Sequence, residues 1–205
     1  MFLEPYHHET AKSGWIEVIC GSMFSGKTEE LIRRINRAVI AKQKISIFKP
    51  TLDRRYDEVK VVSHNKNSLV SIPVENSKEI LEKVGDSVVV GIDEAQFFDE
   101  DLPEVITILA NRGIRVILSG LDMDFEGKPF GMMPQLMCIA EFVTKVHAIC
   151  VCCNGVAQHS FRLNFSEEQV LLGEKDEYEP RCRACFNEGM KEKEFVKMKK
   201  IEVLG

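Results

Sequence analysis

An octet near the N-terminus, Gly21-Ser22-Met23-Phe24-Ser25-Gly26-Lys27-Thr28, has residue types and spacing that suit the binding of nucleotide phosphates. Its glycines allow the backbone N–H groups to turn towards phosphate oxygens, and a helix that begins at the end of the loop adds partial positive charge. Lys27 would then reach the β- and γ-phosphates, and the Thr28 hydroxyl would bind Mg²⁺. The octet is typical of a P-loop, with an ordinary glycine turn as the alternative.

Two adjacent carboxylates, Asp93 and Glu94, follow a nearly continuous apolar run, Val88–Ile92. Such a run is typical of a parallel strand that is buried on both faces. In P-loop proteins an acidic residue at the end of this strand binds Mg²⁺, directly or through water, and we predict this role for Asp93. Glu94 points in another direction and is free for proton transfer. The alternative is a helix N-cap, a role that the Asp99/Asp101 region could also fill.

Seven cysteines are present, and four of them form two Cys-x-x-Cys pairs, Cys150/Cys153 and Cys182/Cys185. Two such pairs can supply four thiolates to a tetrahedral zinc ion with little strain. No ligand position would remain for water, so we expect the zinc ion to be structural. A redox pair is the main alternative. Cys152 crowds the first pair and could compete as a ligand, although only Cys150 and Cys153 have the two-residue gap of the second pair.

Apolar runs and helical periodicities alternate along the chain and indicate the elements that position these groups. We predict strands at Trp15–Cys20, Ile45–Phe48, Val70–Val74, Val88–Ile92, Ile114–Ser119 and Glu141–Ile149. We predict helices after the P-loop, at Lys78–Lys83 and at Leu102–Arg112, the last of which is closed by Gly113. The alternation of strands and helices predicts an α/β fold around a mostly parallel sheet.

Four further stretches have both a functional and a structural interpretation. Arginines after the P-loop could bind phosphate or nucleic acid, but we favour a solvated helix face for Arg33, Arg34 and Arg37. The polar segment Lys49–Val62 is either a ligand loop or an ordinary connection. Two aromatic residues beyond a strand could line a base pocket or fill the core, namely Phe125 and Phe130. Tyr178 is at first interpreted as a surface tyrosine packed on the cysteine pairs.

Between the cysteine pairs, Asn154–Arg181 lacks a helical period and is too polar for a core. A zinc ion at its base would hold both ends of this long loop and let its interior fold over a ligand. After it, Lys191–Lys200 alternates in charge, which predicts a solvated tail. We therefore divide the chain into an extension (residues 1–13), a nucleotide-binding α/β domain (14–149), a zinc-binding domain (150–190) and a charged tail (191–205).

The composition is that of a globular chain, with 205 residues, 44% hydrophobic and 29% charged, and a formal net charge of -5. The acidic balance argues against a large nucleic-acid surface, which normally carries a basic excess. The first 14 residues lack the apolar core of a signal peptide, and no run approaches the ~20 apolar residues of a membrane span. These features predict a cytoplasmic enzyme that binds neither membrane nor nucleic acid.

Taken together, the motifs closely resemble those of the zinc-containing, cellular-type (type II) thymidine kinases. The resemblance rests on Gly-Ser-Met-Phe-Ser-Gly-Lys-Thr, Ile-Asp-Glu-Ala-Gln-Phe-Phe, Gly-Leu-Asp-x-x-Phe-x-x-x-Pro-Phe and the two cysteine pairs, which occur in this order between Gly14 and Glu188. It implies a RecA-like domain, a small zinc domain with a long lasso loop, and transfer of the γ-phosphoryl group of ATP to the 5′-hydroxyl of thymidine. It also implies Mg²⁺ with ATP, a structural zinc ion, a cytoplasmic homotetramer and feedback inhibition by dTTP.

The resemblance further implies roles for individual residues. Glu94 matches the catalytic base, while ATP and Mg²⁺ would be bound by Asp93, Gln96 and the octet Gly21–Thr28. Asp53 and Arg55 match an Asp-x-Arg-Tyr element near the transferring phosphates. The residues implied for the thymidine pocket are Met23, Phe97, Leu121, Phe125, Phe130 and Tyr178, with Val170, Leu171, Leu172 and Gly173 from the lasso. For Tyr178, the pocket role replaces the earlier interpretation as a surface residue. Cys152 and the N-terminal extension have no counterpart in the family's motifs.

Two functions from other classes remain as alternatives. Asp-Glu-Ala-Gln is similar to a helicase motif in which the glutamate activates water, which would indicate a nucleic-acid motor. The single P-loop domain, the acidic net charge and the lack of a second motor lobe argue against it. A zinc-knuckle module that binds nucleic acid should carry a basic, aromatic-studded stripe, which the sequence does not show.

Overall fold

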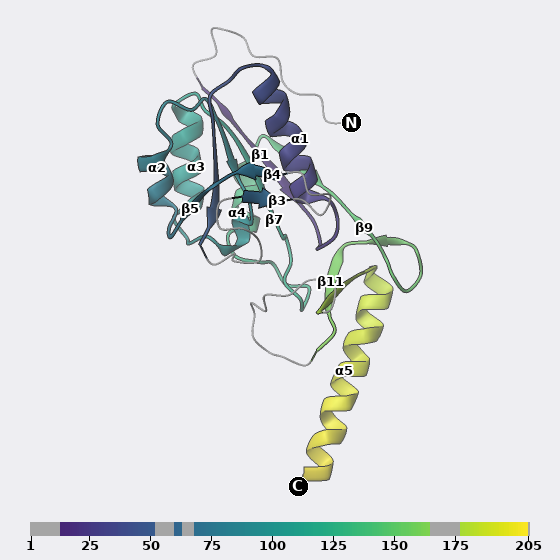
Figure 1. Ribbon diagram of the computed structural model, residues 1–205. Helices are drawn as coiled ribbons and strands as arrows, with labels where there is room; N and C mark the ends of the chain where they lie inside the picture. Colours follow the sequence, from purple (N-terminus) through teal and green to yellow (C-terminus); the bar gives the residue numbers. More distant parts are fainter. Residues whose placement is uncertain (1–12, 52–59, 63–67, 165–176, 205) are drawn as a thin grey trace.

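The computed structural model describes residues 13–51, 60–62, 68–164 and 177–204 (Figure 1). A six-stranded sheet forms its centre and consists of β1 (Trp15–Cys20), β2 (Ile45–Pro50), β5 (Ile72–Val74), β6 (Val89–Ile92), β7 (Arg115–Gly120) and β8 (Phe142–Lys145). The strand order is β5-β2-β6-β7-β1-β8, and every pairing within the sheet is parallel. The predicted α/β fold with a mostly parallel sheet is confirmed.

Helices cover both faces of this sheet (Figure 1). On one face α1 (Lys27–Ile40) packs against apolar side chains of the central strands, among them Ile19 and Ile117. The other face is covered by α2 (Lys78–Lys83), α3 (Leu102–Asn111) and α4 (Met133–Ile139), and it holds the largest cluster of buried apolar residues. Because successive residues of a strand point to opposite faces, Val18 belongs to this larger cluster whereas Ile19 faces α1.

The face of α1 that packs on the sheet contains a buried arginine. Arg34 lies four residues before the buried Ala38, and its side chain is fully buried, so the predicted solvated arginine face is wrong for this residue. Glu17 on β1 explains the burial, because its carboxylate accepts a hydrogen bond from Arg34 Nη1 at 2.8 Å. The other two arginines of the group, Arg33 and Arg37, are exposed as predicted.

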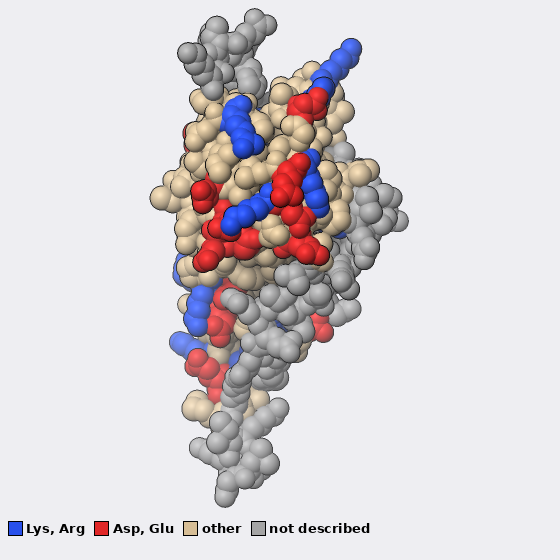
Figure 2. Space-filling model, turned by 90° about the vertical axis from the view of Figure 1, so that its left-hand side faces the viewer, with Lys and Arg blue, Asp and Glu red and all other residues tan. Residues whose placement is uncertain are grey.

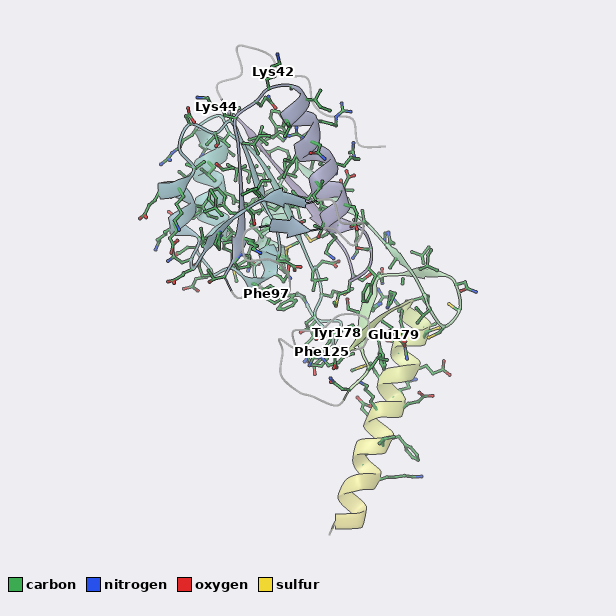
Figure 3. All side chains as sticks on the ribbon, in the orientation of Figure 1. Lys42, Lys44, Phe97, Phe125, Tyr178 and Glu179 are labelled. Atoms are coloured by element: carbon green, nitrogen blue, oxygen red, sulfur yellow. The ribbon has the colours of Figure 1, made fainter. Side chains whose placement is uncertain are left out.

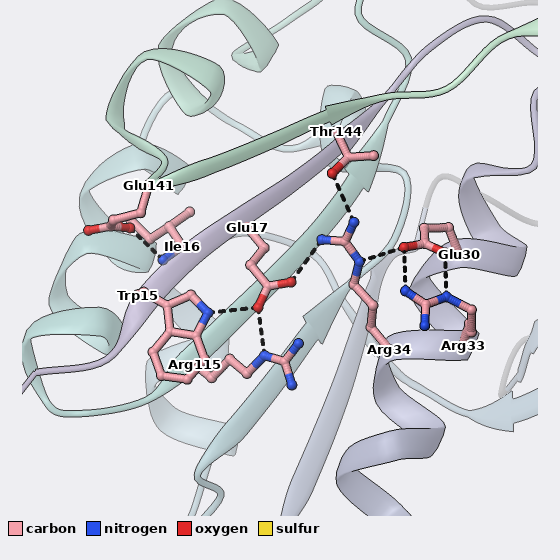
Figure 4. A network of polar contacts seen from close by, with 9 residues as sticks. All are labelled: Trp15, Ile16, Glu17, Glu30, Arg33, Arg34, Arg115, Glu141 and Thr144. Carbon is pink, nitrogen blue, oxygen red and sulfur yellow. Dashed lines mark hydrogen bonds and ion pairs between the residues drawn. The ribbon is translucent and has the colours of Figure 1, made fainter. Parts of the chain in front are cut away.

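Figure 4 shows the polar network around this buried pair. Glu17 also accepts a hydrogen bond from Arg115 Nε at 2.6 Å, and Arg34 donates to Glu30 at 2.8 Å and to Thr144 at 2.9 Å. Both buried charges are therefore paired and hydrogen-bonded, which offsets the cost of removing them from water. The network joins α1 to β1, β7 and β8, and so holds the helix that follows the P-loop against the sheet.

Two of the predicted strands are divided in the structure. Val70–Val74 is interrupted at Ser71, so that β4 (Ser68–Val70) pairs with β3 (Lys60–Val62) in an antiparallel hairpin while β5 joins the main sheet. Glu141–Ile149 is divided into β8 and β9 (Ala148–Ile149), where the chain leaves the main sheet. β9 pairs with β10 (Val156–Ala157) on either side of the first cysteine pair.

The segment that carries the cysteines contains more regular structure than the sequence indicated. β11 (His159–Arg162) pairs antiparallel with β12 (Tyr178–Arg181), and the two strands form the stem of the predicted lasso. All four residues of β11 are buried, so the prediction that Asn154–Arg181 is too polar for a core is wrong for this strand. The following helix, α5 (Arg183–Leu204), continues through the predicted tail and points away from the sheet (Figure 1).

The face of the molecule that carries α2 and α3 has charges of both signs (Figure 2). Lysines and carboxylates are paired there, as in Lys78–Asp101 at 2.7 Å and Lys83–Glu79 at 2.5 Å. The described residues of this face thus do not form the continuous basic stripe that binds nucleic acid. Within the described ranges, every helix is also too short or too polar to cross a membrane.

Candidate active site

The P-loop runs from the end of β1 to the start of α1, where the sequence predicted it. Gly21 has a φ of 148°, and a Cβ at this position would lie 2.2 Å from the carbonyl oxygen of Val146, so only glycine fits. Gly26 has a φ of 84° in the left-handed region, directly before Lys27, the first residue of α1. The first N–H groups of α1 are therefore positioned at the loop, where they favour an anion.

Lys27 folds back over the P-loop. Its Nζ donates a hydrogen bond to the carbonyl oxygen of Ser22 at 2.8 Å, and the same oxygen accepts one from Ser25 Oγ at 2.7 Å. A phosphate oxygen is a stronger acceptor than a carbonyl because it carries charge, and it would compete for the ammonium group. The geometry of Lys27 thus suits the phosphate-binding role predicted for it.

Asp93 lies at the carboxyl end of β6, beside the first turn of α1. Its Oδ2 is 3.5 Å from Thr28 Oγ1, while its Oδ1 accepts hydrogen bonds from the Glu94 backbone N–H at 3.0 Å and from the Ser119 hydroxyl. Burial, together with the negative charge of Glu94, raises the pKa of Asp93 to about 7. A nearby cation would stabilise the ionised carboxylate, and a carboxylate beside a hydroxyl offers the oxygen ligands that Mg²⁺ prefers.

Glu94 has a left-handed backbone conformation (φ 53°, ψ 43°), which is uncommon for a residue with a side chain. Its Oε2 accepts a hydrogen bond from Gln96 Nε2 at 2.5 Å, and Gln96 Oε1 accepts one from the Leu121 N–H at 2.9 Å. Backbone strain of this kind is concentrated at functional sites. Gln96, in the short 3₁₀ turn η1 (Ala95–Phe97), thus holds the Glu94 carboxylate and connects it to the segment after β7.

The aromatic residues predicted for a base pocket form two groups. Phe97 and Phe130 pack edge to face with their ring centroids 5.6 Å apart. Phe125 and Tyr178 form the second group and lie close together near the lasso stem (Figure 3), where both contact the guanidinium group of Arg162. The remaining predicted contacts lie outside the described residues, namely Asp53, Arg55, Val170, Leu171, Leu172 and Gly173.

Two P-loop residues contact the segment that carries the cysteines. The backbone N–H of Met23 donates a hydrogen bond to Ser160 Oγ on β11 at 2.9 Å. The side chain of Phe24, whose backbone is left-handed (φ 63°), packs against a buried cluster that includes Ala148 and Ala157. The nucleotide loop and the cysteine segment therefore support each other, a relationship that neither motif indicates alone.

The four predicted zinc ligands come together in space. The sulfur atoms all lie within 4.8 Å of one another in Cys150, Cys153, Cys182 and Cys185. The sulfurs of Cys153 and Cys182 are 3.6 Å apart, close to the ~3.8 Å between ligands of a tetrahedral site with zinc–sulfur bonds of ~2.3 Å. Cys152 is exposed and is not one of the clustered sulfurs, which agrees with the assignment based on register.

The ionisation of these thiols also fits a cation. Burial acts to raise the pKa of Cys150, but hydrogen bonds from backbone N–H groups of the other cysteines outweigh it and lower the pKa to about 6. Hydrogen bonds with Cys182 and Cys153, by contrast, raise the pKa of Cys185. Since four neighbouring sulfurs cannot all carry negative charge without compensation, a divalent metal ion would allow each of them to act as a thiolate ligand. The cluster is consistent with zinc.

Three residues with contacts in the site were not predicted from the sequence: Ser119, Ser160 and Arg162. Ser119 could have been found, because it is a polar residue near the end of the buried strand β7, next to the strand that ends at Asp93. Ser160 and Arg162 lie in a segment whose composition indicated a polar loop. Their contacts depend on the pairing of β11 with β12, which no local pattern marks.

Comparisons with known proteins find relatives that match most of the chain. The family model described as "Thymidine kinase" matches residues 14–186. The chain is similar to a thymidine kinase of Porphyromonas gingivalis, with 58% identity over 184 residues and 90% of each chain covered. It is also 58% identical over 186 residues to a thymidine kinase of Bacteroides thetaiotaomicron, covering 91% of this chain and 94% of the relative. A thymidine kinase of Rhodothermus is 59% identical over 173 residues, covering 84% and 81%.

Proposed function

This chain belongs to the thymidine kinase family, and from that membership we propose that it transfers the γ-phosphoryl group of ATP to the 5′-hydroxyl of thymidine, forming dTMP and ADP. The observation that carries the proposal is the position of Glu94, a carboxylate held by Gln96 and adjacent in the chain to Asp93 beside the P-loop. A phosphate-binding loop alone would indicate only nucleotide binding. A carboxylate that can accept a proton beside this loop supports transfer to a hydroxyl group.

On the donor side, the P-loop binds the phosphates of ATP. Lys27 exchanges the Ser22 carbonyl for the β- and γ-phosphates, and the N-terminus of α1 contributes its backbone N–H groups. Thr28 and Asp93 would hold Mg²⁺, which when bound supplies positive charge to the phosphates. Ser119 and the Glu94 N–H keep the Asp93 carboxylate oriented towards Thr28.

On the acceptor side, Glu94 takes the proton of the 5′-hydroxyl as its oxygen attacks the γ-phosphorus. A nucleoside hydroxyl is a poor nucleophile, so a carboxylate within hydrogen-bond reach helps as charge develops on the oxygen. The hydrogen bond from Gln96 restrains the Glu94 side chain before the substrate arrives. Most of the rate enhancement should come from the alignment of the hydroxyl with the γ-phosphate and from charge neutralisation by Lys27 and the metal ion.

The thymine base would bind between two sets of aromatic residues: those of η1 and the segment after β7, and that of the lasso stem. Phe97 with Phe130, and Phe125 with Tyr178, provide rings on which a flat base can stack. The four-cysteine cluster would hold a structural zinc ion at the base of the lasso, because all four ligand positions would be taken by thiolates. The lasso contacts Val170–Gly173, the Asp53 and Arg55 element, the division into domains, the cytoplasmic homotetramer and inhibition by dTTP stay predictions.

The proposal is tested by an assay of ADP formation with ATP, Mg²⁺ and a panel of nucleosides. We expect ADP formation with thymidine to exceed that with purine nucleosides and with cytidine by orders of magnitude. Product analysis should show one dTMP for each ADP. ATP hydrolysis that is stimulated by DNA and unaffected by thymidine would contradict the proposal and favour a nucleic-acid motor.

A further inference from the structure

A buried arginine on the lasso stem contacts two of the residues proposed for the thymidine pocket. Arg162, the last residue of β11, is 1% exposed. Its Nε and Nη2 donate hydrogen bonds to the Tyr178 hydroxyl oxygen at 3.0 Å and 2.6 Å. Its guanidinium carbon lies 3.6 Å from the centre of the Phe125 ring. One side chain thus holds an aromatic residue from each side of the proposed pocket.

The two aromatic residues belong to segments that are far apart in the chain. Tyr178 begins β12 and lies directly opposite Arg162 in the β11–β12 ladder. Phe125 belongs to the turn after β7, which Asp124 braces by accepting hydrogen bonds from the N–H groups of Glu126 at 2.9 Å and Lys128 at 3.0 Å. Each segment is held by its own hydrogen bonds, and the guanidinium group connects the two segments.

The backbone of Arg162 is itself anchored. Lys193 Nζ, on α5, donates hydrogen bonds to the carbonyl oxygens of Arg162 and, at 2.6 Å, of Asn164. The segment that carries Phe125 begins at Leu121, whose N–H donates a hydrogen bond to Gln96. Gln96 in turn donates to the carboxylate of Glu94. The lasso stem is therefore connected to Glu94 by the Arg162–Phe125 contact, the chain from Phe125 back to Leu121, and the hydrogen bonds of Gln96.

We propose that Arg162 is a positioning residue for the nucleoside acceptor: it holds Tyr178 and Phe125 in register, so that the base is placed correctly relative to Glu94. This inference rests on the proposed function and concerns the same site. Arg162 acts through these two residues, because its side chain is buried and contacts both of them. The role needs an arginine, since only the planar guanidinium group can stack on a ring and donate two hydrogen bonds within its plane. A lysine offers a point charge without the flat face.

A purely structural role for Arg162 predicts a different result from a positioning role. If the side chain only stabilises the fold, its replacement should affect ATP and thymidine binding alike, in proportion to the fraction of folded protein. If it positions the acceptor pocket, thymidine binding should weaken while ATP binding is retained, because none of the described P-loop contacts involves Arg162. The two substrates therefore serve as internal controls for each other.

Arg181 provides a matched control in the same hairpin. Its guanidinium carbon also lies 3.6 Å from the centre of an aromatic ring, that of Phe161, but it contacts neither Tyr178 nor Phe125 in the hydrogen bonds and ring contacts that join the described residues. Arg162→Met and Arg181→Met thus each remove one arginine–aromatic stack from the β11–β12 hairpin. Only the first of them should alter the acceptor site.

The test measures the dissociation constants of thymidine and ATP by calorimetry, with KM and kcat, for the wild type, Arg162→Met, Arg162→Lys, Tyr178→Phe, the Arg162→Met/Tyr178→Phe double variant and Arg181→Met. We expect Arg162→Met to raise the thymidine constants by about tenfold to a hundredfold, since hydrogen bonds from a charged group and a desolvated stack are both lost. Its ATP constants should stay within about twofold. Arg162→Lys should retain more thymidine affinity than Arg162→Met but less than the wild type. The double variant should lose less thymidine affinity than the sum of the two single losses, because effects of residues in contact are not additive.

The outcomes separate this inference from the proposed function. A wild type that neither binds nor phosphorylates thymidine would overturn both. A functional wild type with equal thymidine constants for Arg162→Met and Arg181→Met would overturn the positioning role alone, as would a parallel loss of ATP and thymidine binding. If Arg162→Met does not fold, Arg162→Lys and Tyr178→Phe decide, and unchanged thymidine affinity in both would likewise overturn it.

Discussion

The backbone N–H of Met23 in the P-loop donates a hydrogen bond to the hydroxyl of Ser160 on β11 at 2.9 Å, joining residues that lie 137 positions apart. The next P-loop residue, Phe24, packs against the apolar cluster beside the cysteines. The loop that would bind ATP is thus supported by the segment that would cover thymidine. The Ser160 hydroxyl should therefore influence the binding of ATP, although it belongs to the segment that carries the lasso.

Ser160→Ala should weaken the binding of ATP. The Met23 N–H loses its acceptor in a partly buried position, and an unsatisfied N–H group costs about 1–3 kcal/mol. The ATP dissociation constant from calorimetry and the free energy of unfolding from urea titration measure the effect. Ser160→Thr is the control, because it keeps a hydroxyl at the same place. Equal ATP affinities for the two variants would show that the hydrogen bond does not support the loop.

Glu94→Gln should lower kcat by ~10²–10⁴-fold while ATP binding and thermal stability are retained. The substitution keeps the size of the side chain and removes its ability to accept the proton of the hydroxyl group. Steady-state kinetics with thymidine give kcat, and calorimetry gives the affinity for ATP. Glu100→Gln changes a nearby exposed carboxylate and should leave kcat unaltered. Turnover near the wild-type rate in Glu94→Gln would remove Glu94 from the role of base.

Arg34→Met should destabilise the fold by ~1.5–3 kcal/mol, because the buried carboxylate of Glu17 loses one charged hydrogen-bond donor while Arg115 still pairs with it. Arg33→Met is the matched control: Arg33 also pairs with Glu30, but its side chain is 48% exposed, and such pairs contribute ~0–1 kcal/mol. Urea unfolding of both variants measures the difference. Similar stabilities for the two would contradict the importance assigned to the buried network.

Cys182→Ser should reduce the zinc content below about one ion per chain and lower the melting temperature. Thymidine affinity should fall as well, because the cysteine cluster lies at the base of the lasso stem. Cys152→Ser serves as the control, since Cys152 is outside the cluster, and this variant should retain about one zinc ion. Metal analysis by mass spectrometry decides between the two cysteines. Zinc loss in Cys152→Ser with full zinc in Cys182→Ser would overturn the ligand assignment.

His159 should make the fold less stable in mild acid. Burial, followed by the positive charges of Arg183 and Lys145, lowers the pKa of His159 below its usual value of about 6.5. The unfolded chain then binds a proton that the folded chain does not, so stability present above pH ~6.5 is lost as the pH falls through the lowered pKa. His159→Phe should flatten the dependence of unfolding free energy on pH below about 6.5. An unchanged slope would exclude His159 as its source.

The chemistry of the chain could be predicted because its motifs are local. The octet Gly21–Thr28 acts within one strand–loop–helix unit, so its glycines, lysine and threonine need no distant partner to adopt their geometry. Each Cys-x-x-Cys pair likewise forms half of a tetrahedral site by itself. The continuous apolar run before Asp93 indicated a strand buried on both faces, and β6 has this environment.

The burial of Arg34 on α1 could not be predicted from the local sequence pattern. The sequence-based prediction assigned Arg34 to a solvated helix face, apart from the apolar residues such as Ala38. The structure buries it, because Glu17 on β1 faces the same side of the sheet and neutralises the charge. The pattern within one element shows which positions share a face. It does not show which oppositely charged residue of another element will meet them.

The P-loop, the carboxylates after β6 and the cysteine pairs were therefore determined by the sequence itself, and with them the class of reaction. The tertiary structure decided what holds these groups in place. Ser160 supports the P-loop and Arg162 contacts Phe125 and Tyr178 only because β11 and β12 pair and pack beside the sheet domain. Such contacts join residues far apart in the chain, and their energy depends on burial and on partners that only the folded protein brings together.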